Sequence, residues 1–319
     1  MNIVVLEGYT LNPGDLKWDR LEKLGNLKIY EQTLEEDALE RIGDAEVIFV
    51  NKTKLSAEVF EKAPNLKYVG VLATGYDSID IKAAKKENVV VTNIPDYGTS
   101  SVAQFVFALL LEMTHHVWEH SEAVKKGEWE ESKGFCFWKY PLIELKDKTM
   151  GIIGYGRIGR ETAEIAKAFG MKVVAYTRTP DKTMEEDNFK FVEFNELLRQ
   201  SDFISLHSPL TKNTKGIINK KTISKMKDGV MLINTARGAL VVEEDLAEAL
   251  ENKKIAAAAS DVMTKEPPDN NNPLIKAENM IITPHIAWAP KESRGRLMNI
   301  AVDNLERFLE GNPVNVVNT

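Results

Sequence analysis

Short apolar runs, many of them β-branched, alternate with charged amphipathic segments along the chain. Before residue 95 the runs are IVVLEG (3–8), VIFV (47–50), YVGVL (68–72) and VVVTN (89–93). A second series comprises TMGIIG (149–154), KVVAYT (172–177), DFISLH (202–207), VMLIN (230–234), IAAAAS (255–260) and MIITP (280–284). Such alternation is typical of βα units around a parallel sheet. It predicts an α/β protein with two Rossmann-like or flavodoxin-like lobes, each a doubly wound parallel sheet.

Between the two series, the stretch SSVAQFVFALLLEM (100–113) is predicted to be a helix, with apolar residues on nearly all of its faces. Ser101 and Gln104 have the spacing of a capping box, which predicts that the helix starts there. Because nearly all its faces are apolar, we expect a buried helix between the lobes. A last helical pattern covers residues 297–309 and ends at Gly311.

Composition narrows the possible functions. The chain has 319 residues, a net charge of −7 and a pI near 5.5. The acidic balance argues against nucleic acid as a partner. Cys136 is the only cysteine, so an intrachain disulfide is excluded and a reducing compartment is expected. The N-terminus lacks the features of a signal peptide, and the most apolar run, 102–111, is half the length of a bilayer span. We therefore expect a cytoplasmic protein with no membrane association.

A glycine-rich motif, GYGRIG (154–159), follows the strand TMGIIG and precedes an amphipathic helical segment. In this strand-to-helix context, Gly154 permits the tight turn, Gly156 lets the backbone approach a pyrophosphate, and Gly159 allows close helix packing. The N–H groups of Arg157 and Ile158 would then face the phosphates at the helix N-terminus. The motif predicts a dinucleotide site.

The end of the next strand bears on which dinucleotide binds. NAD is usually selected there by an acidic side chain that hydrogen-bonds the ribose 2′-OH. This chain has Thr177 and Arg178 instead, and Arg178 could pair with a 2′-phosphate. The alternative is that Arg178 is a solvated loop charge and that Thr177 accepts NAD. The cofactor is therefore expected to be NAD or NADP.

Three strands of the second series are followed by ionisable residues. Arg237 follows VMLIN, Asp261 and Glu266 follow IAAAAS, and His285 follows MIITP. Ligands of open parallel sheets bind at the carboxyl ends of the strands, so these groups should converge on the rim that carries the glycine loop. No group with metal-ligand spacing accompanies His115, His116 and His120, so no metal is expected.

Reduction of a 2-keto acid by a nicotinamide cofactor requires a cation for the carboxylate, a proton donor for the carbonyl oxygen, and an acid that keeps the donor protonated. Arg237, His285 and Glu266 supply these three groups. Asp261 could hold the nicotinamide carboxamide. In the N-terminal lobe, backbone N–H groups of Leu72, Ala73, Thr74 and Gly75 could receive the substrate carboxylate.

With these residues in place, the whole chain resembles the D-isomer-specific 2-hydroxyacid dehydrogenase family. The matching motifs are GYGRIG, HSPLTKNTKGIIN, NTARGALVVEEDL, SDVMTKEPP and ITPHIAWAP. Within the family, LATGYDSID, NIPDYGTSSVAQ and GFCFWKYPLIELKDKTMGIIGYG, together with Trp288, are most similar to the glycerate dehydrogenase branch, which reduces hydroxypyruvate.

The resemblance implies a substrate-binding domain of residues 1–100 plus 287–319, a Rossmann domain of residues 101–286, and a homodimer formed largely through the latter. It implies a catalytic triad of Arg237, Glu266 and His285. The cofactor contacts that it implies are Arg157, Ile158, Thr177, Pro209, Thr214, Thr235 and Asp261. The chain departs from NAD-dependent members at Thr177 and Arg178, where an acidic residue is usual.

Two other functions are compatible with the same scaffold. Formate dehydrogenases of this fold carry Gln where Glu266 stands, and formate has no oxygen to protonate, so Glu266 argues against formate oxidation. A dinucleotide-sensing corepressor without catalytic activity is the other alternative. The chain has no peptide-binding extension or disordered tail that would favour it.

Overall fold

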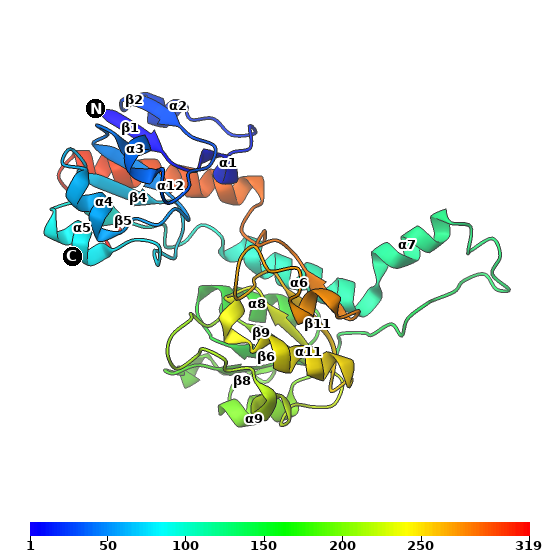
Figure 1. Ribbon diagram of the computed structural model, residues 1–319. Coiled ribbons are helices and arrows are strands. Elements are labelled where there is room, and N and C mark those ends of the chain that lie inside the picture. The colour runs from blue at the N-terminus through cyan, green and yellow to red at the C-terminus, as the bar shows by residue number, and fades with distance from the viewer. The chain divides into compact units, whose positions relative to one another are not determined.

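The computed structural model describes all residues, 1–319, and the chain divides into two compact units. The first unit combines the two chain ends, Met1–Gly98 and Trp288–Thr319, and the second unit is Thr99–Ala287. Each unit contains one parallel β-sheet covered by helices (Figure 1). The α/β class and the two parallel sheets predicted from the alternating pattern are confirmed.

The first unit is built on a five-stranded sheet in the order β2-β1-β3-β4-β5. Its two faces are covered by separate apolar clusters, one including helix α12 and the other helices α3 and α4. The strands are β1 (Asn2–Val5), β2 (Asn26–Ile29), β3 (Val47–Val50), β4 (Tyr68–Val71) and β5 (Val90–Thr92). The helices are α1 (Gly8–Leu11), α2 (Asp19–Glu22), α3 (Ala38–Ile42), α4 (Ala57–Lys62), α5 (Ile81–Lys86) and α12 (Lys291–Leu309).

The second unit has a seven-stranded sheet in the order β12-β11-β10-β9-β6-β7-β8. Its strands are β6 (Thr149–Ile153), β7 (Lys172–Tyr176), β8 (Phe189–Phe191), β9 (Phe203–Leu206), β10 (Val230–Asn234), β11 (Ile255–Ser260) and β12 (Met280–Ile282). Its α-helices are α6 (Thr99–His115), α7 (Val117–Lys125), α8 (Arg157–Ala168), α9 (Phe194–Gln200), α10 (Lys220–Ile223) and α11 (Glu243–Glu251). Short 3₁₀ helices are η1 (Lys182–Met184), η2 (Gly238–Leu240) and η3 (Pro273–Lys276).

The strand order of the second unit determines where a ligand can bind. The chain builds outward from β6 through β7 and β8 on one side, and through β9 to β12 on the other. Ligands of such sheets bind at the carboxyl ends of the strands, where the order reverses. Here that point lies between β6 and β9.

Helix α6 is buried along most of its length and packs against α8 and the sheet of the second unit. Ser101 lies inside this helix, which begins at Thr99, so the predicted capping box at Ser101 is wrong. No helix of the chain is both long and apolar enough to span a bilayer.

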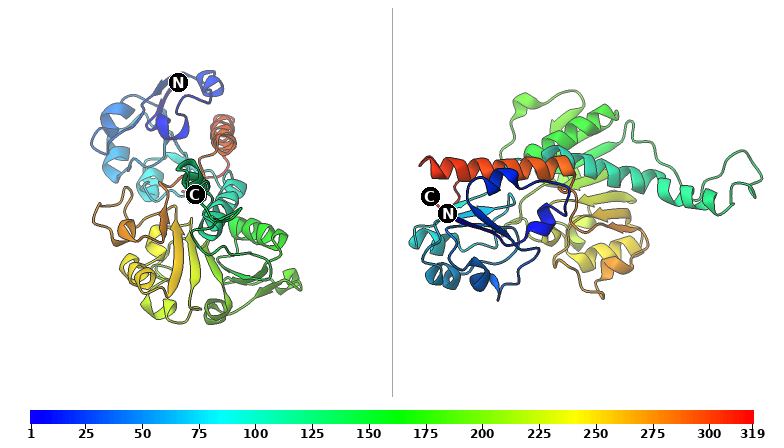
Figure 2. Two further views of the ribbon diagram at one scale, coloured as in Figure 1. Left: turned by 90° about the vertical axis from the view of Figure 1, so that its right-hand side faces the viewer. Right: turned by 90° about the horizontal axis from the view of Figure 1, so that it is seen from above.

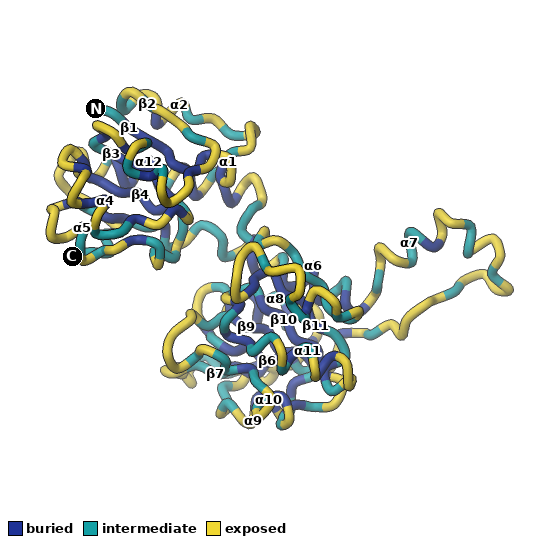
Figure 3. The backbone as a smooth tube through the Cα atoms, viewed as in Figure 1, coloured by how far each residue is buried: buried dark blue, intermediate teal, exposed yellow.

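Residues 117–142, which we call the arm, extend away from the sheet of the second unit (Figures 1 and 2). Most of the arm is exposed, as the colouring of Figure 3 shows. Its exposed residues nevertheless include several large apolar side chains: Val117, Trp118, Val124, Trp129, Phe135, Trp138, Tyr140 and Leu142.

Candidate active site

The glycine loop follows β6 and contacts the end of β9. Gly154 has φ +101°, and a Cβ there would come within 2.7 Å of the backbone of His207 and Ser208. A Cβ on Gly159 would lie 2.2 Å from the carbonyl oxygen of Gly154, so this glycine lets α8 pack closely against the loop. Both positions therefore require glycine, for the backbone reasons that the motif predicts.

The space around Gly156 suits a pyrophosphate. A Cβ on Gly156 would meet no atom within 4 Å, although the residue stands at the N-cap of α8. The first-turn N–H groups of a helix lack intrahelical acceptors and favour an anion. Directly after β10, the buried hydroxyl of Thr235 has no hydrogen-bond partner. An open loop, a helix N-terminus and an unpaired buried hydroxyl fit a dinucleotide.

The other residues expected at the dinucleotide follow β7 and β9. Thr177 is partly buried and Arg178 is exposed directly after β7. Pro209 and Thr214 are joined by a hydrogen bond, in which the Thr214 hydroxyl donates to the Pro209 carbonyl at 2.6 Å. All four residues follow strands that flank the glycine loop.

Arg237 is held in an exposed turn after β10. The side chain of Asn234, itself buried, donates to the Arg237 carbonyl at 2.9 Å and accepts from the Ala236 N–H at 3.1 Å. The Arg237 guanidinium donates to the Ala236 carbonyl at 2.7 Å. Asn234 thus fixes the backbone that presents the guanidinium, a role for which sequence reasoning did not select it.

Glu266 and His285 are brought into direct contact. Nδ1 of His285 donates to Oε2 of Glu266 at 2.7 Å, and each side chain is 31% exposed. The other carboxylate oxygen of Glu266 accepts from the Met263 N–H at 3.1 Å. Because Nδ1 is engaged, Nε2 is the ring nitrogen left for a substrate.

Asp261 supports the turn that carries His285. This carboxylate is 1% exposed and accepts three hydrogen bonds, from the Thr283 hydroxyl at 2.6 Å, the Ile286 N–H at 2.9 Å and the Ala287 N–H at 2.8 Å. His285 stands inside this turn with φ +57°, a left-handed conformation. These three hydrogen bonds hold the turn at residues 283–287 against the end of β11.

Leu72, Ala73, Thr74 and Gly75 lie in the first unit, at the carboxyl end of β4. The Leu72 N–H donates to the Val50 carbonyl at 2.7 Å, and the Thr74 hydroxyl donates to the Ile94 carbonyl at 2.7 Å. These bonds anchor the segment to the end of β3 and to the loop after β5.

His207 is a further ionisable group beside the glycine loop. Its backbone N–H donates to the Ile153 carbonyl at 2.8 Å, and Nε2 is hydrogen-bonded to the Ser205 hydroxyl at 2.9 Å. Burial lowers the pKa of His207 from 6.5 to about 4, so the ring is neutral at pH 7. The sequence placed His207 at a strand end but gave no sign of this shift.

Known proteins match the chain over its full length. Residues 107–287 match the family "D-isomer specific 2-hydroxyacid dehydrogenase, NAD binding domain". A hydroxypyruvate reductase from Blautia hydrogenotrophica is 57% identical over 321 residues, covering 100% of both chains.

Two solved structures share the fold. A D-lactate dehydrogenase from Aquifex aeolicus complexed with NAD and lactic acid is 32% identical with a TM-score of 0.85, covering 100% of this chain and 99% of that one. An acyclic imino acid reductase in complex with NADPH and D-Arg is 33% identical with a TM-score of 0.84, covering 99% of this chain and 100% of that one.

The chain belongs to the D-isomer specific 2-hydroxyacid dehydrogenase family. It is an oxidoreductase that acts on the CH–OH group of 2-hydroxy acids with a nicotinamide dinucleotide. The family resemblance drawn from the motifs is confirmed.

Proposed function

We propose that the protein interconverts hydroxypyruvate and D-glycerate, with glyoxylate as a second substrate. The observation that carries this proposal is the 2.7 Å contact between Glu266 and His285, a proton donor backed by an acid. The 57% identity to a hydroxypyruvate reductase supports the choice of substrate. The nicotinamide dinucleotide, when bound, supplies a hydride from C4 to the 2-carbon of the substrate.

Three residues form the catalytic set of this proposal. Nε2 of His285 gives its proton to the substrate oxygen as the hydride arrives at C2, so the keto acid gains both and becomes the hydroxy acid. Glu266 favours the protonated imidazole and fixes its orientation through Nδ1. Arg237 binds the substrate carboxylate and polarises the carbonyl. In the reverse direction, His285 accepts the proton.

The proposed substrate contacts also include the backbone N–H groups of residues 72–75, which would receive the substrate carboxylate. We assign this part of substrate binding to the first unit, and dinucleotide binding and the catalytic set to the second. The dinucleotide would be held by the glycine loop, the start of α8 and the ends of β7 and β9 to β11: Gly154, Gly156, Arg157, Ile158, Gly159, Thr177, Arg178, Pro209, Thr214, Thr235 and Asp261.

We propose that the cofactor site admits NADP as well as NAD. Arg178 is exposed after β7, and no acidic side chain stands at Thr177 to repel a 2′-phosphate. Arg178→Ala should lower kcat/KM for NADPH about 10-fold, the value of one charge-assisted hydrogen bond, and leave kcat/KM for NADH unchanged. A wild-type enzyme that uses NADH alone would remove the NADP assignment.

The substrate proposal is tested by following the loss of NADH and NADPH absorbance with hydroxypyruvate, glyoxylate, pyruvate and phenylpyruvate. We expect the highest kcat/KM with hydroxypyruvate. A preference for phenylpyruvate or pyruvate would change the proposed substrate but not the proposed reaction class. Absence of turnover with all four acids would overturn the proposed function.

We also propose that the protein is a homodimer of the reducing cytoplasm. The single cysteine supports the compartment, and the exposed apolar side chains of the arm, which belongs to the second unit, support self-association. Light scattering coupled to gel filtration should give twice the mass of 35.8 kDa. A monomeric mass at micromolar concentration would contradict the dimer.

A further inference from the structure

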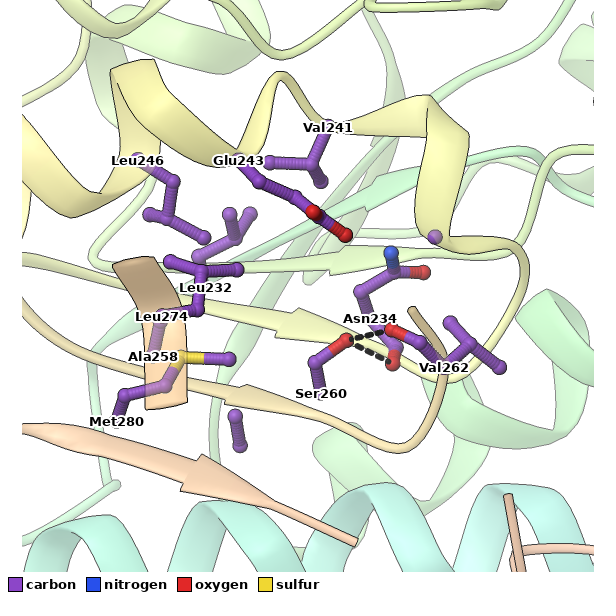
Figure 4. Close-up of a pocket in the computed structure, with 12 residues that line it drawn as sticks. Leu232, Asn234, Val241, Glu243, Leu246, Ala258, Ser260, Val262, Leu274 and Met280 are labelled. Atoms are coloured by element: carbon purple, nitrogen blue, oxygen red, sulfur yellow. Dashed lines mark hydrogen bonds between the residues drawn. The ribbon is translucent and has the colours of Figure 1, made fainter. Parts of the chain in front are cut away.

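Glu243, the first residue of α11, binds the loop that carries Glu266. Its Oε1 accepts from the Thr264 N–H at 2.8 Å, and its Oε2 accepts from the Asn272 side-chain amide at 2.7 Å. One carboxylate therefore joins the two ends of the segment 264–272. Figure 4 shows the Glu243 side chain among the residues that line a small pocket between β10, β11 and α11.

The segment 264–272 is mostly exposed, and none of its residues is fully buried. Thr264, Lys265, Glu266 and Pro267 are all exposed. At its far end Asn272 is held in one orientation, because its side-chain oxygen accepts from the Leu274 N–H at 3.0 Å while its nitrogen donates to Glu243. Hydrogen bonds rather than buried apolar area therefore fix this segment to the second unit.

The backbone at the Thr264 end of the segment also packs against Gly238. A Cβ on Gly238 would lie 2.0 Å from the Met263 carbonyl carbon and 2.2 Å from the Thr264 nitrogen. The turn that follows Arg237 thus packs directly on the peptide that donates to Glu243. The Met263 N–H, in the preceding peptide, donates to Glu266 at 3.1 Å, so the position of Glu266 depends on this stretch of backbone.

We propose that Glu243 is a positioning residue that holds Glu266 in hydrogen-bond contact with His285. This inference rests on the proposed function, in which the Glu266–His285 pair supplies the proton. Glu243 contacts neither the substrate nor the reacting atoms. It acts by anchoring the segment 264–272 at both ends, so that the Glu266 carboxylate stays in line with Nδ1 of His285.

The competing explanation is that Glu243 only stabilises α11 through the helix dipole. Glu244, the next residue, is exposed in the same first turn and has the same charge near the N-terminus. It makes no hydrogen bond to the segment 264–272, so Glu244→Gln is a matched control. Glu243→Gln keeps the shape of the side chain but turns one of its two acceptors into a donor facing another donor.

In steady-state kinetics with hydroxypyruvate, Glu243→Gln should lower kcat about 10-fold, since small misplacements of a catalytic group cost one to two orders of magnitude. KM should change little, because Glu243 contacts neither the substrate nor its binding residues. Asn272→Ala should act in the same direction, whereas Glu244→Gln should match the wild type. An unchanged kcat in Glu243→Gln would overturn the inference.

A double-mutant cycle tests whether Glu243 affects kcat through Glu266 or by disturbing the fold in general. Added to Glu266→Gln, the change Glu243→Gln should lower kcat further by less than about two-fold, because coupled residues are not additive. A full 10-fold further loss would mean that Glu243 acts elsewhere. The thermal midpoints of Glu243→Gln and Glu244→Gln should agree within a few degrees.

The ring ¹⁵N resonances of His285 give a readout that does not require turnover. They should shift in Glu243→Gln and stay unchanged in Glu244→Gln. If the wild type reduces none of the 2-keto acids while this shift occurs, the proposed function fails and the positioning role stands. If the wild type is active and the resonances do not move, the positioning role fails alone.

Discussion

Glu266 and His285 form a 2.7 Å hydrogen bond across 19 positions of sequence. Each follows one of two neighbouring parallel strands, and the register pairs Ser260 of β11 with Ile282 of β12. The loops after the two strands therefore leave the sheet at the same level. Adjacent parallel strands make this contact possible, and the hydrogen bonds of Asp261 and Glu243 hold the two loops in place.

His285→Ala should lower kcat for hydroxypyruvate by about 10²- to 10⁴-fold, the usual value of general acid catalysis, with little change in KM. Glu266→Gln should show a smaller loss, because the imidazole remains. His115→Ala, an exposed residue at the end of α6, serves as the control and should match the wild type. Near-normal turnover of His285→Ala would show that the proton comes from another group.

Arg237→Ala should raise KM for hydroxypyruvate and lower kcat as well. A hydrogen bond to a charged group is worth about 1.5 to 3 kcal/mol, which corresponds to roughly a 10- to 100-fold loss in kcat/KM from binding alone. Arg237→Lys should restore part of it, since an ammonium lacks the bidentate fork. Arg199→Ala, exposed on α9, is the control. If KM and kcat are both unchanged in Arg237→Ala, the substrate carboxylate is bound by other residues.

Two substitutions in the glycine loop should affect stability differently. Gly154→Ala places a Cβ within 2.7 Å of the His207–Ser208 backbone at φ +101°, so it should lower the free energy of unfolding by about 1 to 3 kcal/mol. Gly156→Ala meets no atom within 4 Å and should leave thermal stability unchanged.

Calorimetric titration with NADH and NADPH measures the dinucleotide affinity of Gly156→Ala and of the wild type. Gly156→Ala should weaken dinucleotide binding, because its methyl group occupies the space assigned to the pyrophosphate. Wild-type affinity in Gly156→Ala would mean that the dinucleotide does not approach this part of the loop.

Strands buried in the sheets could be predicted from sequence, but two edge strands could not. β2 (Asn26–Ile29) is mostly exposed, and β8 (Phe189–Phe191) has only three residues. Both lie at sheet edges, where a continuous apolar run is not required. The start of α6 was placed wrongly because Thr99, Ser100 and Ser101 offer three successive polar starting points.

In the candidate active site, too, the sequence predicted some residues and missed others. The rule that ligands bind at strand ends selected Glu266 and His285 because each residue lies in the loop that follows its own strand. Glu243 contacts Thr264 and Asn272, which are 21 and 29 positions away, and no local pattern specifies that contact. Asn234 was read as the end of an apolar strand, and its bonds to the Arg237 turn depend on how that turn folds back.

His207 makes stability depend on pH in a defined direction. Its pKa is about 4 in the folded protein because of burial, against an ordinary value of 6.5. Between these values the unfolded chain binds a proton that the folded chain does not, so stability is complete above pH 6.5 and is lost as the pH falls toward 4. From pH 7.5 to pH 5 this single group should remove about 2 kcal/mol.

Urea denaturation of the wild type and His207→Asn at pH 7.5 and pH 5 measures this contribution. Carboxylates and other histidines titrate in both proteins, so their effect cancels in the difference between the two. The wild type should lose about 2 kcal/mol more than His207→Asn over this range, whereas His115→Asn should behave as the wild type does. An equal loss in wild type and His207→Asn would mean that His207 is protonated in the folded protein at pH 5, in which case the ring beside the glycine loop is open to water.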